Sequence, residues 1–393
     1  MKQFFTRQLT DKSSNLQIFR SSNLIYSLLL PLVVLSSCRH DITIIDSDNH
    51  EIGDTLKGLH GFYLLNEGNL GSNKASLDYY DFATGVYTTD IYAQRNPSVV
   101  KELGDVGNDL KIYGNRLYAV INASNKIEVM TADSAKRIGQ IDVPNCRCLA
   151  FDGQYGYVTS YAGPIMIGDT HAQIGYVLKF DTATLQPLDT CHVGFQPEGI
   201  ATSNSKLYVA NSGGYMASVY DSTLSVIDIN SFQEIKRLTV DVNMQHVTAD
   251  RYGQLWVNSL GDYYDRPSRL YCIDTETESI TALPFAASNF CIEGDSLYFY
   301  SVAWSYVDMA NTISFGIVDI KTHQLLSQQF ITDGTETDIE VPYGICVNPI
   351  TKDIYITDAK TYVIPGVLYC YTPDGVRKWS VRTGDIPGHF AIY

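Results

Sequence analysis

The side chains that could act as an acid, a base or a metal ligand stand beside a recurring apolar position. Glu198 lies two residues before Ile200, and His246 and His389 each lie directly before an apolar residue. A carboxylate and two imidazoles could perform acid-base chemistry if one fold gathered them. However, the sequence contains no nucleophile elbow, no phosphate-binding glycine loop and no HExxH motif. We therefore expect these residues to bind a ligand, and we predict that the protein is not an enzyme.

A second group of candidate binding residues is aromatic. The chain has 28 Tyr, 15 Phe and 3 Trp, and several of these rings fall in long segments between apolar runs. A tyrosine offers a flat apolar ring together with a hydroxyl, which suits a ligand that must be both packed and hydrogen-bonded. Single rings could instead cover their own loops, but as a set they predict a binding surface: Tyr161, Tyr215, Tyr220, Tyr263, Tyr264, Trp304, Tyr306 and Tyr362.

The elements that must position these residues are short, repeated β-strands. After residue 60, alternating apolar runs broken by Gly, Asn, Asp and Pro are typical of β-structure. The segments QPEGIA (196–201), VPYGIC (341–346) and IPGHFA (386–391) share a proline followed by an apolar strand, and weaker copies occur elsewhere. The aligned apolar residues recur at intervals of 39 to 55: Leu110, Leu149, Ile200, Val247, Phe290, Ile345 and Phe390.

Each of the first six copies continues with further strands. A second strand, eight to ten residues later, is centred on an aromatic residue: Tyr118, Tyr157, Tyr208, Trp256, Tyr298 and Tyr355. A third strand ends in an aspartate, which can accept backbone hydrogen bonds and set the following turn: Asp81, Asp181, Asp228, Asp274 and Asp319. A more variable fourth strand closes each unit. Four antiparallel strands repeated at this spacing indicate the blade of a β-propeller.

The seventh copy, PGHFAIY (387–393), ends after its first strand. Its other strands are expected near the beginning of the propeller, in GFYLLN (61–66), LDYYD (77–81) and VYTTDIY (86–92). The predicted fold is therefore all-β: a seven-bladed β-propeller over residues 61–393, closed by pairing of N- and C-terminal strands in one blade. Closure removes two edges that would otherwise be unpaired.

In such a ring the first strands start, and the second strands end, at the same opening of the central channel. We expect the ligand to bind there, to the rings above and to a polar set: Arg147, Glu198, Asn211, Gln245, His246, Asn289, Tyr343 and His389. The two histidines would lie nearly across the channel, so a shared metal ion is not expected. Asp169, Asp262 and Asp265 could bind calcium, but isolated loop acids are usually solvated. We predict no metal and no cofactor.

The N-terminus has the features of an export signal. A basic lead precedes the apolar run LIYSLLLPLVVL (24–35), which is too short to cross a bilayer as a helix. The sequence Leu35-Ser-Ser-Cys38 resembles the lipobox of bacterial lipoproteins, which implies a signal peptide over 1–37 and lipidation of Cys38; the alternative is a plain secretory signal with an incidental cysteine. Residues 38–60 are acidic and are expected to form a tether. Their acids resemble the surface-export signal of Bacteroidota lipoproteins, so we expect a lipid-anchored protein on the outer face of the outer membrane.

Composition excludes some partners. The chain carries 28 Lys and Arg against 43 Asp and Glu, for a net charge of -15. This charge repels nucleic acid and anionic membrane surfaces, so contact with a membrane is expected only through the lipid anchor. The seven cysteines after Cys38 include no CxxC pair, and we interpret them as buried thiols.

The repeat and the anchor resemble known families. LYVAN (207–211), with PEGIA before it and LSVID after it, resembles the YVTN-type repeats of YncE-like propellers. Together with the lipobox at Cys38 and the tyrosine-rich face, the chain resembles the BtuG-type surface lipoproteins of Bacteroidota. That resemblance implies capture of cobalamin (vitamin B12) or a related corrinoid, and its transfer to a BtuB-like TonB-dependent transporter. The alternatives are a glycan-binding surface lipoprotein, a propeller enzyme of lactonase or lyase type, and a structural surface-layer role.

Overall fold

The computed structural model describes residues 47–393, apart from 101, 166–167, 169–170, 217–218 and 306–309. The expected signal peptide, Cys38, Asp169 and Tyr306 lie outside the described residues. The chain divides into two units, Met1–Ile44 and Ile45–Tyr393, and the second contains everything described below. Within the described part of the chain, no helix has the length and apolar character needed to span a membrane.

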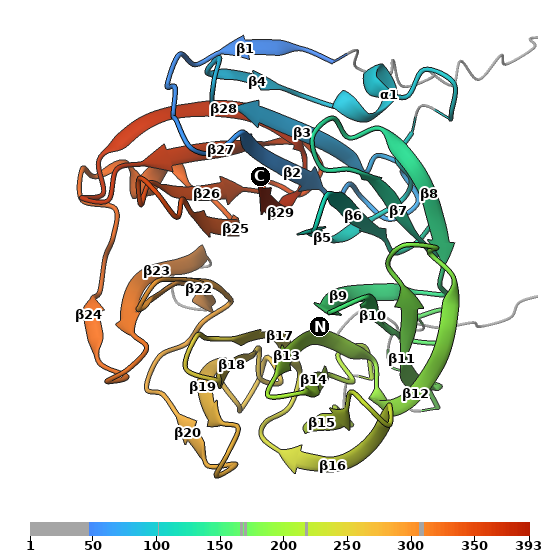
Figure 1. Ribbon diagram of the computed structural model, residues 1–393. Helices are drawn as coiled ribbons and strands as arrows, with labels where there is room; N and C mark the ends of the chain where they lie inside the picture. Colours follow the sequence, from blue (N-terminus) through green and yellow to red (C-terminus); the bar gives the residue numbers. More distant parts are fainter. Residues whose placement is uncertain (1–46, 101, 166–167, 169–170, 217–218, 306–309) are drawn as a thin grey trace, which may run out of the picture. The chain divides into compact units, whose positions relative to one another are not determined.

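Seven antiparallel sheets surround a central channel and form the blades of a propeller (Figure 1). Blade 1 has five strands, from the outside inward β1 (Asn49–Glu51), β4 (Val86–Thr88), β3 (Ser76–Asp81), β2 (Gly61–Asn66) and β29 (Pro387–Ile392). From the channel outward, blade 2 consists of β5 (Gly107–Tyr113), β6 (Arg116–Ile121), β7 (Lys126–Thr131) and β8 (Arg137–Asp142). Blade 3 consists of β9 (Cys146–Asp152), β10 (Tyr155–Ser160), β11 (Ile174–Asp181) and β12 (Pro187–Phe195). Blade 4 consists of β13 (Pro197–Ser203), β14 (Lys206–Asn211), β15 (Thr223–Asp228) and β16 (Gln233–Thr239).

Blades 5 to 7 repeat the same order. Blade 5 consists of β17 (Met244–Ala249), β18 (Gln254–Ser259), β19 (Arg269–Asp274) and β20 (Ile280–Ala282). Blade 6 consists of β21 (Asn289–Glu293), β22 (Ser296–Ser305), β23 (Ala310–Asp319) and β24 (Leu325–Ser327). Blade 7 consists of β25 (Pro342–Val347), β26 (Ile354–Asp358), β27 (Pro365–Tyr371) and β28 (Arg377–Asp385). A helix α1 (Ile91–Arg95) follows β4, and a 3-10 turn η1 (Thr335–Asp338) precedes β25. The predicted seven-bladed fold is confirmed.

The two ends of the propeller meet in blade 1, as predicted. Strand β29 pairs antiparallel with β2, with Leu64 opposite Phe390 and Phe62 opposite Ile392. The N–H group of Gly61 donates to the carbonyl of Tyr393, and the Tyr393 ring stacks on His60 with centroids 4.7 Å apart. Strand β29 therefore closes the ring as the innermost strand of the blade.

Two expected boundaries near the N-terminus are wrong. The tether was expected to reach residue 60, but residues 49–51 form β1, which pairs with β4, and the apolar side chains of Ile52, Leu56 and Leu59 pack onto blades 1 and 7. These apolar contacts, together with the pairing of β1, hold an otherwise acidic segment on the fold. The fourth strand was expected over 86–92, but β4 ends at Thr88 because Asp90 has a left-handed φ of 43° and the chain then enters α1.

The hydrophobic core lies in the seams between blades. Each of seven clusters of buried residues combines side chains from two neighbouring blades. In the seam between blades 4 and 5, Tyr208 and Val226 pack with Val247 and Leu255. The repeated apolar and aromatic positions therefore join successive blades, and every blade depends on both of its neighbours.

The aspartates that end the third strands set turns, as predicted. Asp81 Oδ1 accepts hydrogen bonds from the N–H groups of Ala83 and Thr84 at 2.8 and 3.0 Å. The aspartates of other blades accept the same pair of bonds: Asp181, Asp274 and Asp319. These hydrogen bonds give the aspartates a structural role in the turns.

The carboxyl of Asp90, at the start of α1, predicts a pH dependence of stability. Burial, and then the charges of Asp78 and Glu102, raise its pKa from the ordinary value to about 7. Unfolding restores the ordinary value, so the free energy of unfolding should fall as the pH rises from about 4 through about 7. Asp90→Asn should therefore be more stable than the wild type by about 2 to 4 kcal/mol at pH 8, and equally stable near pH 4. Asn also tolerates the left-handed backbone.

Urea denaturation at several pH values measures this difference. Asp152→Asn, at an exposed position, is the control and should leave the pH profile unchanged. A wild type and an Asp90→Asn variant with parallel profiles would show that Asp90 has an ordinary pKa.

Candidate ligand-binding site

β-bulges turn the starts of the inner strands toward one opening of the channel, which we call the mouth. On β9, Leu149 pairs with Val158 and Cys146 pairs with Ser160, so Arg147 and Cys148 share a single opposing position. The same register shift occurs near the start of the other inner strands except β21: β5, β13, β17, β25 and β29. A bulge bends its strand and re-aims the side chains in it. The mouth consists of these bulges and the described residues of the loops after the second strands, at 67–75, 161–165, 168, 171–173, 212–216, 219–222, 260–268 and 359–364.

One side of the mouth holds a carboxylate bound by two neighbours. Arg147, on blade 3, donates from Nε and Nη2 to the two oxygens of Glu198 on blade 4, at 2.9 and 3.0 Å. The hydroxyl of Tyr161 donates to the same carboxylate, and its ring lies 4.9 Å from the Arg147 guanidinium carbon. The paired geometry fixes the position of all three groups. The structure thus brings these predicted site residues together.

Burial controls the protonation of this cluster. Burial lowers the pKa of Arg147, but the Glu198 charge, the Tyr161 and Tyr215 hydroxyls and the hydrogen bond to Glu198 together raise that pKa above its ordinary value. Burial also raises the pKa of the Tyr161 hydroxyl, although Arg147 opposes the shift. The cluster therefore contains a permanent cation and a hydroxyl that keeps its proton, both held on Glu198.

The opposite side of the mouth holds a similar cluster around Glu67, which the sequence analysis missed. Tyr343 donates its hydroxyl to Oε2 of Glu67 at 2.9 Å, and Nε2 of His389 lies 2.9 Å from Oε1. Burial, then Glu67, raises the pKa of Tyr343, so this hydroxyl also keeps its proton. Glu67 directly follows the second strand of blade 1, one residue beyond the positions that the repeat aligns. A search extended by one residue would have included it.

Exposed tyrosines stand beside both clusters. Tyr215 contacts Tyr161 edge to face at 6.3 Å between centroids, and Tyr362 contacts Tyr343 in the same way at 6.1 Å. The exposed fractions of the mouth tyrosines are 37% for Tyr215, 44% for Tyr362, and 63% and 88% for the neighbouring pair Tyr263 and Tyr264. These four rings offer apolar surface at the mouth.

The pKa of the Tyr215 hydroxyl responds to charges in both clusters. Burial is the main cause that raises the pKa of Tyr215, and the carboxylates of Glu198 and Glu67 add to it while Arg147 opposes it. Tyr220 is half-buried in the same loop, and its pKa is raised by burial and then by Tyr263.

The other predicted site residues have different environments. Asn211 is fully buried and bonds to Thr223 and Ser225 inside its own blade, so it cannot contact a ligand at the mouth. Asn289 donates to the carbonyl of Tyr343 and thereby joins blades 6 and 7. Gln245 is partly exposed and donates to Asn243. The side chain of Trp304, like Tyr306, lies outside the described residues.

His246 lies inside the channel as a neutral imidazole. Burial, followed by the charges of His389 and Lys111, lowers its pKa to about 4. Among the described residues no side chain forms a hydrogen bond with the imidazole of His246, whereas Nε2 of His389 faces Glu67. The two histidines thus differ in role: His389 belongs to the Glu67 cluster and His246 does not.

Comparison with known proteins identifies the family. The family described as Domain of unknown function (DUF5074) matches residues 60–365. The chain belongs to this family. No match was found among curated protein sequences.

Several solved structures share the fold of this DUF5074 chain. A quinonprotein alcohol dehydrogenase-like protein from Bacteroides thetaiotaomicron is 14% identical, with a TM-score of 0.58 and coverage of 87% of this chain and 78% of its own. Apo AztD from Citrobacter koseri is 10% identical, with a TM-score of 0.50 and coverage of 86% and 98%. Kuenenia stuttgartiensis hydrazine synthase is 15% identical, with a TM-score of 0.51 and coverage of 67% and 76%. At these identities the likeness shows the propeller fold alone.

One cluster of possible metal ligands lies away from the mouth. Asp54, Asp353 and Cys370 bring three possible metal ligands together, but Lys378 Nζ lies 2.6 Å from Asp54 Oδ2 and 3.0 Å from Asp353 Oδ2. This ammonium pairs with both carboxylates and already occupies the space between them. The seven cysteines after Cys38 are free thiols: four are buried and Cys148, Cys291 and Cys346 are partly buried.

Proposed function

We propose that the mouth captures a bulky small molecule that is apolar in body and rich in amide groups, with cobalamin or a related corrinoid as the ligand. One observation carries this proposal: exposed tyrosines at the mouth accompany two clusters of fixed hydrogen-bonding groups, centred on Glu198 and Glu67, and two of these rings, Tyr215 and Tyr362, contact a cluster directly. Flat rings can pack on the body of such a ligand, while carboxylate, hydroxyl and amide groups can bond its fringe of amides.

The geometry suits tight binding for two reasons. Covering one tyrosine ring with ligand contributes roughly 1 to 3 kcal/mol, so a few rings suffice for high affinity. In addition, Glu198 is held by Arg147 and Tyr161 before any ligand arrives, so little conformational entropy is lost on binding. Loops on a rigid scaffold are a common place for binding sites.

We also propose that the site binds without catalysing a reaction. A general base needs a free acceptor at the reacting atom. Both oxygens of Glu198 and both oxygens of Glu67 already accept hydrogen bonds or face a cation within the protein. Capture and release need only the surface that these residues form.

Lipidation at Cys38 would place this mouth outside the outer membrane, and the resemblance to BtuG-type lipoproteins adds the transfer step. We propose that the ligand passes to a BtuB-like TonB-dependent transporter beneath the propeller. Membrane contact would then be made through the lipid anchor, in keeping with the net charge of -15.

Isothermal titration of the purified protein with cyanocobalamin tests the ligand. Saturable heat with one site per chain is expected at micromolar concentrations, and its absence would remove the corrinoid proposal. A glycan array run in parallel separates the alternative, since the exposed pair Tyr263 and Tyr264 could also stack on sugar rings.

The tyrosine pair provides a sharper prediction. The double variant Tyr263→Ala, Tyr264→Ala should weaken cyanocobalamin binding by roughly ten- to a thousandfold, because it removes the two most exposed rings of the mouth. The matched control is Tyr252→Ala, an exposed ring on a turn at the opposite end of the channel, which should bind like the wild type. Equal losses in the two variants would mean that the mouth is not the site.

A further inference from the structure

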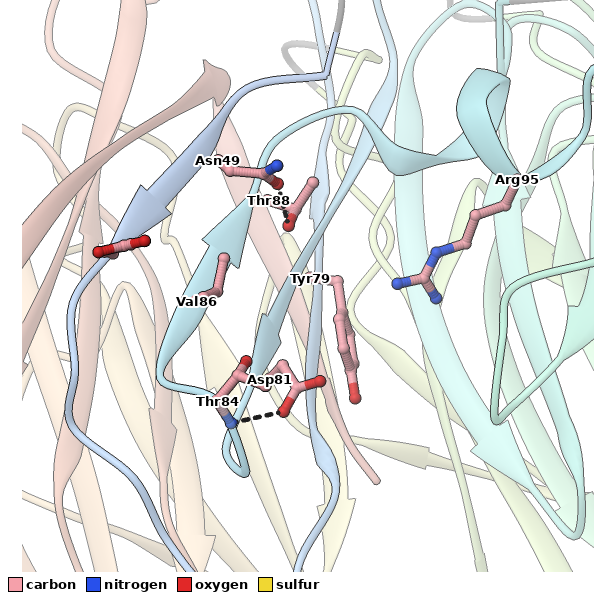
Figure 2. Close-up of a pocket in the computed structure, with 8 residues that line it drawn as sticks. Asn49, Tyr79, Asp81, Thr84, Val86, Thr88 and Arg95 are labelled. Carbon is pink, nitrogen blue, oxygen red and sulfur yellow. Dashed lines mark hydrogen bonds between the residues drawn. The ribbon is translucent and has the colours of Figure 1, made fainter.

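A cavity lies on the outer strands of blade 1 (Figure 2), away from the inner strands that form the mouth. Its volume is about 330 Å³, at the small end of the range for ligand pockets. Strands β1, β3 and β4, the turn after β3 and helix α1 supply its lining: Asn49, Glu51, Tyr79, Asp81, Thr84, Val86, Thr88 and Arg95.

The strand register places these side chains on one face of the sheet. Asn49 and Tyr79 both pair with Thr88, and two residues further along Glu51 and Asp81 both pair with Val86. Residues paired across adjacent strands project to the same side. The short side chains of β4 therefore form a floor, with an acidic residue on each side of it.

Positive and negative groups occupy different parts of this cavity. Arg95 reaches in from α1, with its guanidinium carbon 5.0 Å from the centroid of the Tyr79 ring (Figure 2). No carboxylate of the described residues forms an ion pair with Arg95. Glu51 is exposed and Asp81 uses Oδ1 for its turn, and within the described part of the chain no group bonds Asp81 Oδ2 or the Glu51 carboxylate.

We propose that this cavity binds a small zwitterion, of the size of an amino acid or a dipeptide, whose carboxylate pairs with Arg95 and whose ammonium pairs with Asp81 and Glu51. A simple anion is disfavoured because two carboxylates line the cavity, and a simple cation is disfavoured by the guanidinium. A molecule that carries both charges satisfies all three groups with charge-assisted hydrogen bonds. The site is separate from the mouth, and this inference does not depend on the corrinoid proposal.

Such a ligand would join α1 to the outermost strand of the blade. Strand β1 has three residues and forms the edge of the sheet, so it is held by few bonds. A ligand that contacts Glu51 on one side and Arg95 on the other would slow the opening of β1. Hydrogen exchange of residues 49–51 should therefore slow when the cavity is filled.

Titration of the whole protein with alanyl-alanine and its two blocked forms tests the proposal. Alanyl-alanine should bind, whereas N-acetyl-alanyl-alanine lacks the ammonium and alanyl-alanine amide lacks the carboxylate. Each blocked form should bind roughly ten- to a hundredfold more weakly. Similar affinities for the three probes, or no binding of alanyl-alanine at millimolar concentration, would overturn the proposal.

Two variants locate the binding. Glu51→Gln, at an exposed position that cannot disturb the core, should weaken alanyl-alanine binding several-fold, and Arg95→Gln should weaken it further. The controls are Glu276→Gln and Arg382→Gln, which remove the same charges from exposed positions of blades 5 and 7. If Glu51→Gln and Glu276→Gln bind alanyl-alanine with the same affinity, the cavity is not the binding site. Cyanocobalamin binding should be unchanged in Glu51→Gln.

Discussion

Deletion of residues 387–393 is expected to abolish cooperative unfolding of the propeller. The deletion removes β29, the innermost strand of blade 1, which pairs with β2 along its length. It also removes the Phe390 ring, which packs on Phe62 and Tyr355 in the seam between blades 7 and 1. Phe390 and Ile392 are partly buried. Full burial of such a side chain contributes roughly 1.5 to 3 kcal/mol, and a domain has only about 5 to 15 kcal/mol of net stability.

The deletion also makes β2 the innermost strand of blade 1. Strand β2 would expose unpaired N–H and C=O groups toward the channel, which favours aggregation. Calorimetry and size-exclusion chromatography measure the two effects. The control is Leu326→Ser on β24, an exposed position of an outermost strand, which should leave the melting transition nearly unchanged. A truncated chain that melts like the wild type would contradict ring closure by β29.

Glu198→Ala is expected to destabilise the protein by about 3 to 5 kcal/mol and to abolish ligand capture. Glu198 is 5% exposed and bonds to both Arg147 and Tyr161. Without it, a buried guanidinium has no counter-charge, and leaving a charge of this kind unpaired costs about 3 to 5 kcal/mol. Binding should fail because Arg147 and Tyr161 lose the group that positions them. Urea denaturation and titration with cyanocobalamin measure the two effects.

A double variant separates stability from binding. Replacing both charges, as Glu198→Leu with Arg147→Met, should restore most of the stability because no unpaired charge remains. It should not restore binding. Glu234→Ala is the control, because its ion pair with Arg237 lies at the surface and should contribute about 1 kcal/mol or less. Equal destabilisation by Glu198→Ala and Glu234→Ala would show that the buried pair contributes no more than a surface pair.

The strands and their order could be predicted because their signals are local. Tyr157 is central to the second strand of blade 3 and is fully buried, in a short run that recurs at a fixed distance from the first strand. The outer edge of blade 1 could not be predicted in this way. Asn49–Glu51 is a three-residue strand in an acidic segment, and only its pairing with Val86–Thr88 makes it a strand.

The candidate site was predicted in part. The sequence placed Arg147 and Glu198 at the mouth, but not their direct pairing, which joins blades 3 and 4. Asn211 was selected by its position at the end of a strand, yet it points into its blade. Glu67 was missed because it belongs to a loop, and its partners Tyr343 and His389 come from the other end of the chain.

The sequence by itself determined the propeller, the closing strand and the face on which tyrosines gather. These features follow from the two-residue period of strands and from the recurrence of one pattern, and neither requires knowledge of distant contacts. Only the tertiary structure decided which side chains act together. Bulges re-aim the side chains at the starts of the inner strands. Closure of the ring brings Glu67 within hydrogen-bonding distance of Tyr343, which is 276 residues away in the sequence.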